Sequence, residues 1–268
     1  MALQEEESTP IDWNLTHCCN DEALIFLSLT LGYLLANFFL WNTALLRPMK
    51  LIAVFVHELH HAMACHWTGG SAASIWTIID GGTRTRTDNN NLEEEDQNYT
   101  GGGGGVSKYI GGRRWFIIPA GYVGCSFWGM VFVVLSGDRL ASLIIAVGFL
   151  MALIVSVMCA PSRIVVWVSV GFIVLTTGFI FLDRFVFHPL LQYLTLYYGV
   201  FIGSFSIYDI YDDLVTRSSE GSDAYACSRE LVPCCLPRFI GLQFVVMALG
   251  FLALGLYLAL VWMTTISI

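Results

Sequence analysis

Charged residues are scarce in this sequence. They make up 13% of the 268 residues, while hydrophobic residues make up 56%. A soluble domain usually carries about 25% charged residues. Together with a mean hydropathy of +0.67, this argues against a soluble domain and favours a chain that lies mainly in the lipid bilayer. We therefore expect an integral, multi-pass membrane protein.

Three further absences exclude other classes of protein. The formal net charge is -8 and no basic stripe with interleaved aromatic residues is present, so nucleic-acid binding has no support. The eight cysteines include the adjacent pairs Cys18–Cys19 and Cys234–Cys235 but no CxxC spacing, which argues against a zinc ribbon or a redox motif. The acidic start MALQEEESTPID has no basic n-region, so we expect no cleavable secretion signal.

Seven apolar stretches are candidate membrane spans, and most reach the roughly 17–25 residues that the hydrocarbon core requires. They are Ala23–Leu46, Leu51–Trp67, Trp115–Leu135, Leu140–Ala160, Ile164–Leu182, Leu190–Ile207 and Phe239–Ile268. The second and sixth are short enough to be tilted, broken or re-entrant. We expect an all-α polytopic membrane protein with about six to seven transmembrane helices. Residues 1–22 would form an acidic tail and residues 23–268 a single polytopic domain.

The main insertion outside the membrane is Gly69–Arg114, and it has two parts. Ser71–Asp80 is rich in Ile, Thr and Trp, and Gly81-Gly82 separates it from Thr83–Thr87, which predicts a short hairpin. Asp88–Gly105 has too few apolar residues to offset its ordering entropy, which predicts a disordered tether.

A HExxH motif lies inside the second apolar stretch, formed by His57, Glu58 and His61. On a helix, the two histidines lie about 40° apart around the axis and about 6 Å apart along it. Both imidazoles can therefore reach one zinc ion, and Glu58 can take a proton from a water bound to that ion. Ionisable groups in a membrane helix cost about 2.5–3.5 kcal/mol each, which favours a functional site over buried structural histidines.

A third metal ligand has to come from another part of the chain, because a catalytic zinc site usually has three protein ligands. Cys65 lies about 12 Å along the helix axis from His57, which excludes it as a partner of both histidines unless the helix breaks. Carboxylates are dense between residues 206 and 231. Among them, Asp223 follows Gly221-Ser222 at the start of an expected helix, and its local sequence favours a helix N-cap over a ligand.

Four segments, in this order, carry a resemblance to a known family: HELHHAMACHWTGG, IDGG, RRWFIIPAGYVGCSFWG and DIYDD…GSDA. The chain resembles the site-2-protease-like zinc metallopeptidases, and more narrowly their compact eukaryotic branch without a PDZ domain. The resemblance implies a β-rich segment after the HExxH helix and an aspartate ligand far downstream. It implies that His57, His61 and Asp223 bind Zn²⁺ and that Glu58 is the catalytic base.

The third-ligand segment departs from the family pattern. Better-studied relatives carry an Asn- and Pro-containing run that ends in LDG before the aspartate. Here no asparagine follows Asn98, and GSDA stands in place of LDG. Asp209 is therefore the alternative ligand, and the source of an oxyanion-stabilising group stays open.

The resemblance implies a zinc-dependent intramembrane endopeptidase whose substrates are transmembrane helices of other membrane proteins. An inactive relative acting as a membrane-protein chaperone or adaptor is one alternative, and the intact HExxH motif argues against it. A metal transporter is the other. It would place polar residues on several spans, whereas Leu140–Ala160 and Ile164–Leu182 are almost wholly apolar.

The orientation in the membrane can be predicted from the basic residues, which are enriched on the cytosolic side. If all seven stretches cross, the N-terminus and Gly69–Arg114 share a side with nine basic residues, and four lie opposite. The nine are Arg84, Arg86, Lys108, Arg113, Arg114, Arg163, Arg217, Arg229 and Arg238, and the four are Arg47, Lys50, Arg139 and Arg184. This predicts a cytosolic N-terminus. Glycosylation sequons at Asn14 and Asn98 lie on the same side and argue against it, but such sequons are frequent by chance.

Overall fold

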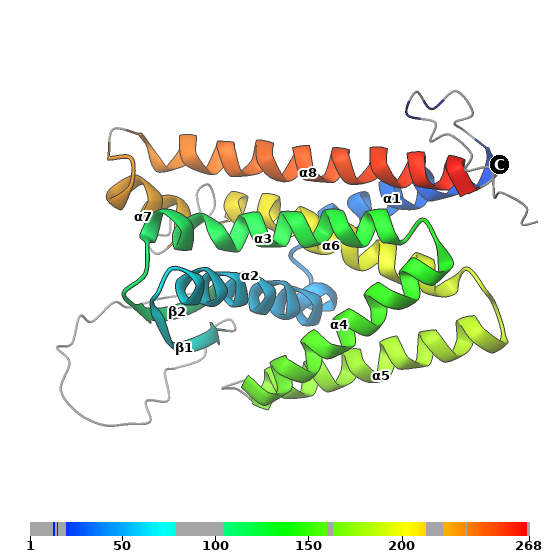
Figure 1. Ribbon diagram of the computed structural model, residues 1–268, viewed down its shortest axis with the longest axis horizontal. Helices are drawn as coiled ribbons and strands as arrows, with labels where there is room; N and C mark the ends of the chain where they lie inside the picture. Colours follow the sequence, from blue (N-terminus) through cyan, green and yellow to red (C-terminus); the bar gives the residue numbers. More distant parts are fainter. Residues whose placement is uncertain are drawn as a thin grey trace, which may run out of the picture.

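The computed structural model describes residues 13, 15, 20–78, 104–159, 163–212, 222–233 and 235–266. Figure 1 shows the arrangement of its elements. The helices are α1 (Asp21–Leu40), the 3₁₀ helix η1 (Ala44–Leu46), α2 (Arg47–Trp67), α3 (Arg114–Leu135), α4 (Arg139–Cys159), α5 (Arg163–Phe185), α6 (Leu190–Tyr211), α7 (Asp223–Glu230) and α8 (Pro237–Ile266). The strands are β1 (Ser71–Ile78) and β2 (Gly104–Ile110).

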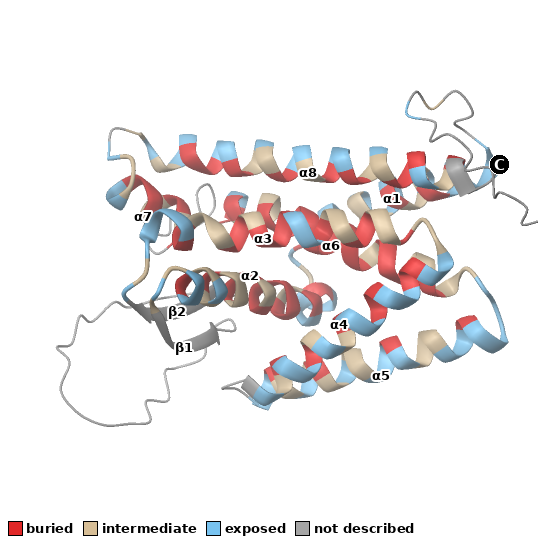
Figure 2. Cartoon of the chain, viewed as in Figure 1, coloured by how far each residue is buried: buried red, intermediate tan, exposed pale blue. Residues whose placement is uncertain are grey.

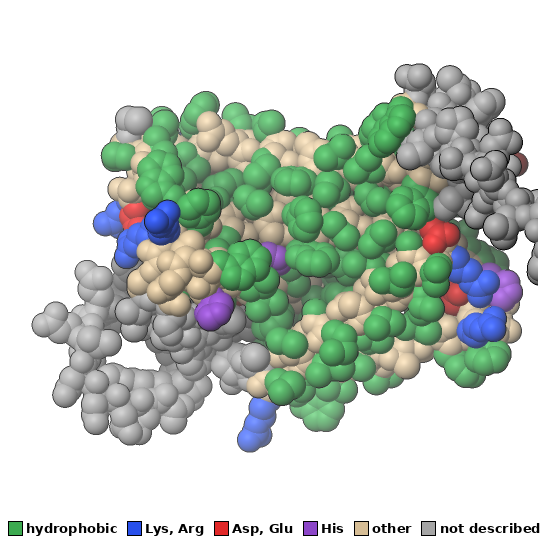
Figure 3. Space-filling model, in the orientation of Figure 1, with side chains coloured by type: hydrophobic (Ala, Val, Ile, Leu, Met, Phe, Trp, Pro, Cys, Tyr) green, Lys and Arg blue, Asp and Glu red, His purple; other side chains and the backbone are tan. Residues whose placement is uncertain are grey.

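Six helices of the described residues are long and apolar enough to cross a membrane: α1, α3, α4, α5, α6 and α8. Charged side chains gather toward the two ends of the molecule, and hydrophobic side chains cover its middle (Figure 3). The helix α2 is not among the six, because its histidines and charged residues lower its hydropathy. The expected all-α, multi-pass membrane protein with six to seven long helices is confirmed.

The centre of the bundle is the pair α3 and α6, both buried along much of their length (Figure 2). Glycines allow the two helices to approach closely. A Cβ on Gly129 would lie closer than 3.0 Å to the backbone of Gly203, and a Cβ on Gly199 would also lie closer than 3.0 Å to the backbone of Val133. Small residues favour such packing, because helix association in lipid depends on van der Waals contact. Gly129 lies against Gly203, and the later residue Val133 lies against the earlier residue Gly199. The two helices are therefore antiparallel.

The helices α2 and α3 are also antiparallel. Near the end of α2, His61 Nδ1 donates a hydrogen bond to the carbonyl oxygen of Ile117, at 2.6 Å. Just beyond α2, the hydroxyl of Thr68 accepts a hydrogen bond from the amide of Arg113, at 3.0 Å. The end of α2 therefore lies beside the start of α3, and α2 runs in the same direction as α6.

The helix α1 runs parallel to α6. The hydroxyl of Tyr33 donates to the carbonyl oxygen of Tyr193 near the start of α6, at 3.3 Å. The indole of Trp41, just after α1, donates to the carboxylate of Asp212 at the end of α6, at 2.8 Å. Consecutive helices α1 and α2 thus run in the same direction. The six apolar helices alternate in direction along the chain (Figure 1). The helix α2 is therefore not a return crossing between α1 and α3.

The scheme of seven alternating crossings is therefore wrong. It placed the N-terminus on the same side as Gly69–Arg114, whereas the start of α1 lies at the opposite end of the bundle from β1 and β2 (Figure 1). The carbonyl oxygen of Trp13 accepts a hydrogen bond from Tyr257, in the second half of α8. Hydropathy locates apolar helices but carries no information about their direction. Residues 41–46, which were predicted to continue the first span, instead connect two helices that run in the same direction.

The predicted β-rich segment after the HExxH helix is confirmed as an antiparallel pair. Ser71 lies opposite Ile110 and Ile78 lies opposite Gly104, with an irregularity between Ala72 and Ser74. This pair follows α2 directly and leads directly into α3, so it holds the end of α2 beside the start of α3.

The pairing of β1 differs from the predicted hairpin, because its partner is β2 and not the segment Thr83–Thr87. Strand propensity indicates which residues are extended but not which strand they meet. The segment Thr83–Thr87 lies outside the described residues. So does the predicted tether Asp88–Gly105, except for Gly104 and Gly105, which begin β2.

Candidate metal site

Three ionisable residues of α2 are buried inside the helix bundle. His57, Glu58 and His61 are 7%, 4% and 3% exposed. The helix α3 allows α2 to bury these groups because it presents Gly121 at the point of contact. A Cβ at Gly121 would lie closer than 3.0 Å to the imidazoles of both histidines. The HExxH motif therefore faces a surface of α3 that is shaped to admit two imidazole rings.

Asp223 is the first residue of α7, and its carboxylate faces the two histidines. The capping role that its local sequence favoured belongs to Ser222, whose side chain accepts a hydrogen bond from the amide of Tyr225. Asp223 is thus not needed as the N-cap. An ion pair between Arg114 and Glu230 ties the end of α7 to the start of α3. Because Ser222 caps the helix, the Asp223 carboxylate is available to face His57 and His61.

Three side-chain atoms converge at this point. His57 Nε2 lies 2.9 Å and His61 Nε2 3.0 Å from Asp223 Oδ2, and the two nitrogens lie 3.0 Å apart. Two imidazoles and one carboxylate form the donor set of many catalytic zinc sites. The convergence of three such atoms on one point fits a small divalent cation.

Neighbouring groups orient one of these side chains and favour the charged form of another, as cation binding requires. His61 Nδ1 donates to the carbonyl oxygen of Ile117, so its Nε2 lone pair is directed toward the other two residues. Burial raises the pKa of the Asp223 carboxyl, but the charges and hydrogen bonds of His61 and His57 outweigh it and hold that pKa well below its usual range. The carboxylate is therefore in the ionised form that metal binding requires.

The sequence match covers most of this architecture. Residues 30–255, from α1 to α8, match the family described as peptidase M50B-like. The chain belongs to the peptidase M50B-like family. This is a family of site-2-protease-like metallopeptidases, so the resemblance stated from the motifs is confirmed. No curated protein and no solved structure gives a significant match to the chain.

Other candidate residues of this M50B-like chain take different places. Asp209, the alternative ligand, accepts a hydrogen bond from the hydroxyl of Tyr122 at 3.1 Å and is not part of the converging group. Cys65 is fully buried near Gly70, beyond the histidines. Glu58 is also outside the group but interacts electrostatically with His61.

Two residues at the site were not found by sequence reasoning. Gly121 makes room for the imidazoles, and the ring of Tyr122 packs edge-on against His57 with ring centroids 4.7 Å apart. The sequence feature that could have indicated them is the segment PAGYVG, in which small residues flank an aromatic residue in the first half of a membrane helix.

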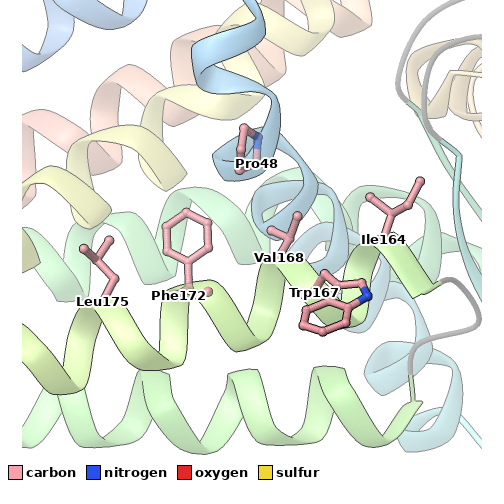
Figure 4. A pocket seen from close by; sticks show the side chains of 7 residues that line it. Pro48, Ile164, Trp167, Val168, Phe172 and Leu175 are labelled. Carbon is pink, nitrogen blue, oxygen red and sulfur yellow. The ribbon is translucent and has the colours of Figure 1, made fainter.

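An apolar groove of about 420 Å³ lies elsewhere, between the start of α2 and the first half of α5 (Figure 4). It is lined by Pro48, Ile164, Trp167, Val168, Gly171, Phe172 and Leu175. None of these residues belongs to the converging group, and none is ionisable. The groove therefore contributes no chemistry to the site.

Proposed function

We propose that this M50B-like protein is a zinc-dependent intramembrane endopeptidase. The observation that carries the proposal is the convergence of His57, His61 and Asp223 beside the buried Glu58, inside a bundle of membrane-crossing helices. The two histidines and the aspartate would hold the metal. When bound, zinc supplies Lewis-acid activation of the scissile carbonyl and of the attacking water.

Glu58 acts as the general base and acid of the reaction. Its carboxylate accepts a proton from the attacking water and returns a proton to the leaving amine. Burial suits this exchange, because interactions between charges are stronger where bulk water is excluded. Its neighbour His61 is fixed in position, since His61 Nδ1 donates a hydrogen bond to the carbonyl oxygen of Ile117.

The substrate would be a transmembrane segment of another membrane protein. The site lies among helices that cross the bilayer, so the peptide bonds that can reach it belong to chains in the bilayer. In an intact helix each carbonyl accepts a hydrogen bond from the amide four residues later. A local unwinding of the substrate must therefore precede cleavage.

Removing a ligand tests the metal site directly. We expect wild-type protein to bind about one zinc per chain, and His57→Ala and Asp223→Ser each to bind almost none, because each loses one of three protein ligands. Metal analysis of the purified proteins measures this. The control is Ser222→Ala, which removes the N-cap beside Asp223. It should cost about 1 kcal/mol of stability and retain zinc.

Undiminished zinc in either ligand variant would refute the metal site. If Asp209→Ser instead loses zinc while Asp223→Ser keeps it, the third ligand is Asp209. A wild-type protein that folds but binds no zinc would favour the inactive adaptor.

For the orientation, we propose that the end of the bundle with β1 and β2 faces the cytosol and that the N-terminus faces away from it. Six described basic residues lie at the end with the strands: Lys108, Arg113, Arg114, Arg163, Arg229 and Arg238. Two lie at the opposite end, Arg139 and Arg184, and the other two described basic residues, Arg47 and Lys50, lie at the start of α2. The enrichment of basic residues on the cytosolic side favours this orientation. It reverses the N-terminal side predicted from seven crossings.

Glycosylation tags measure the orientation in cells. A tag fused before Met1 should be glycosylated, and the same tag inserted between residues 88 and 103 should not, because glycosylation occurs only on the non-cytosolic side. A mobility shift that endoglycosidase removes reports the modification. The opposite pattern would restore the orientation predicted from seven crossings.

A further inference from the structure

The two histidines of the site are held in different ways. The ring of His61 is fixed by a hydrogen bond from Nδ1 to the carbonyl oxygen of Ile117. His57 Nδ1 is buried and has no hydrogen-bond partner among the described residues. A metal-binding histidine almost always donates its second ring N–H to an acceptor, which sets the orientation of the ring. The orientation of His57 therefore has to come from its packing.

The packing around His57 is aromatic. The ring of Tyr122 meets it edge-on, with centroids 4.7 Å apart and planes at 70°. Phe205 of α6 is a more distant neighbour, with centroids 6.3 Å apart. Aromatic rings at such distances and angles attract one another, so Tyr122 can act as the wall that sets the plane of the imidazole.

The ring of Tyr122 is itself held in position. Tyr122 is 2% exposed, and its hydroxyl donates to Asp209 Oδ2 of α6 at 3.1 Å. The ring packs on Phe244 of α8, with centroids 5.2 Å apart. A tyrosine held at its hydroxyl cannot slide along its own ring plane, whereas a phenylalanine at the same place could.

We propose that Tyr122 and Asp209 form a positioning pair that fixes the imidazole of His57 for metal binding. The inference rests on the metal site of the proposed function. It gives Asp209 a role that its sequence position alone could not indicate, since Asp209 supports a ligand and is not one. Neither residue is required to touch the substrate.

Two isosteric variants test the pair. Tyr122→Phe removes the hydroxyl and keeps the ring, and Asp209→Asn removes the charge and keeps the volume. We expect each to bind one metal per chain with about tenfold lower zinc affinity, the lower end of the range for residues that support a ligand. The double variant should lose no more than Tyr122→Phe alone, because without the tyrosine hydroxyl the side chain at position 209 has no bond to Tyr122 left to weaken.

Zinc affinity, measured by competition with a chelator, is the first readout. The visible spectrum of the cobalt-substituted protein is the second, because its bands report the arrangement of the ligands. The matched control is Tyr198→Phe. Tyr198 is also fully buried and shares a hydrogen bond with Thr176 at 3.0 Å, but its ring packs on Phe149. We expect it to lower the melting temperature without changing zinc affinity or the cobalt spectrum.

Wild-type affinity and an unchanged cobalt spectrum in both variants would overturn the pair. So would a complete loss of zinc in Asp209→Asn, since Asp209 would then be a ligand. If Tyr122→Phe fails to fold, Asp209→Asn alone decides. A wild type that binds no zinc refutes the proposed function itself, which separates that failure from a failure of the pair.

Discussion

We expect Glu58→Gln to keep zinc and to lose peptide-bond cleavage. Glu58 is 4% exposed and lies outside the three converging atoms, so its carboxylate is not needed to hold the metal. An amide of the same size cannot accept the proton of the attacking water, and loss of a general base typically costs about 10²–10⁴-fold in rate. Cleavage of a transmembrane reporter in proteoliposomes, with metal analysis of the same samples, measures both properties.

The same substitution at a different glutamate provides the control. Glu230 lies at the end of α7, where it pairs with Arg114, and Glu230→Gln should keep both zinc and cleavage. If Glu58→Gln cleaves at the wild-type rate, Glu58 is not the base. If the wild-type protein binds zinc but cleaves none of a broad set of transmembrane reporters, the adaptor alternative becomes the better description.

Helix positions could be predicted from the sequence because each depends on local hydropathy. The span predicted at Trp115–Leu135 is α3, Arg114–Leu135. The span predicted at Ala23–Leu46 fails at its end, since α1 stops at Leu40. There the indole of Trp41 bonds to Asp212, a residue 171 positions away, and no local pattern reveals such a contact.

The residues of the candidate metal site also differ in how far the sequence alone predicts them. His57 and His61 are one helical turn apart, so their convergence follows from the period of the helix. Asp223 could be predicted as a third ligand only through the family resemblance, because it lies 162 residues beyond His61. Its local sequence pointed to a helix cap, and the neighbouring Ser222 takes that role.

Contacts between helices account for what was missed. Gly121 has no ionisable group and matches no metal motif, yet both imidazoles pass directly over it. A sequence does not show which face of α3 meets α2, so the space that a missing side chain leaves is visible only in the folded chain.

The second large effect, loss of zinc, is expected from the single methyl group that Gly121→Ala adds. In Gly121→Ala, the added Cβ would lie closer than 3.0 Å to atoms of both imidazoles, so the rings have to move. Alanine favours a helix by about 1 kcal/mol over glycine, so α3 itself gains from the change. We expect loss of stoichiometric zinc and of cleavage from a protein that still folds, measured by metal analysis and by the melting temperature.

Two further glycines of the membrane helices make this prediction specific. A Cβ at Gly148 of α4 meets nothing within 4 Å, so Gly148→Ala should keep zinc. Gly124→Ala crowds the ring of His60, which bonds to the carbonyl oxygen of Val56 and is not in the converging group. If zinc is lost only in Gly121→Ala, displacement of the ligand rings is the cause. Equal loss in Gly124→Ala would instead mean that the metal depends on the overall separation of α2 and α3.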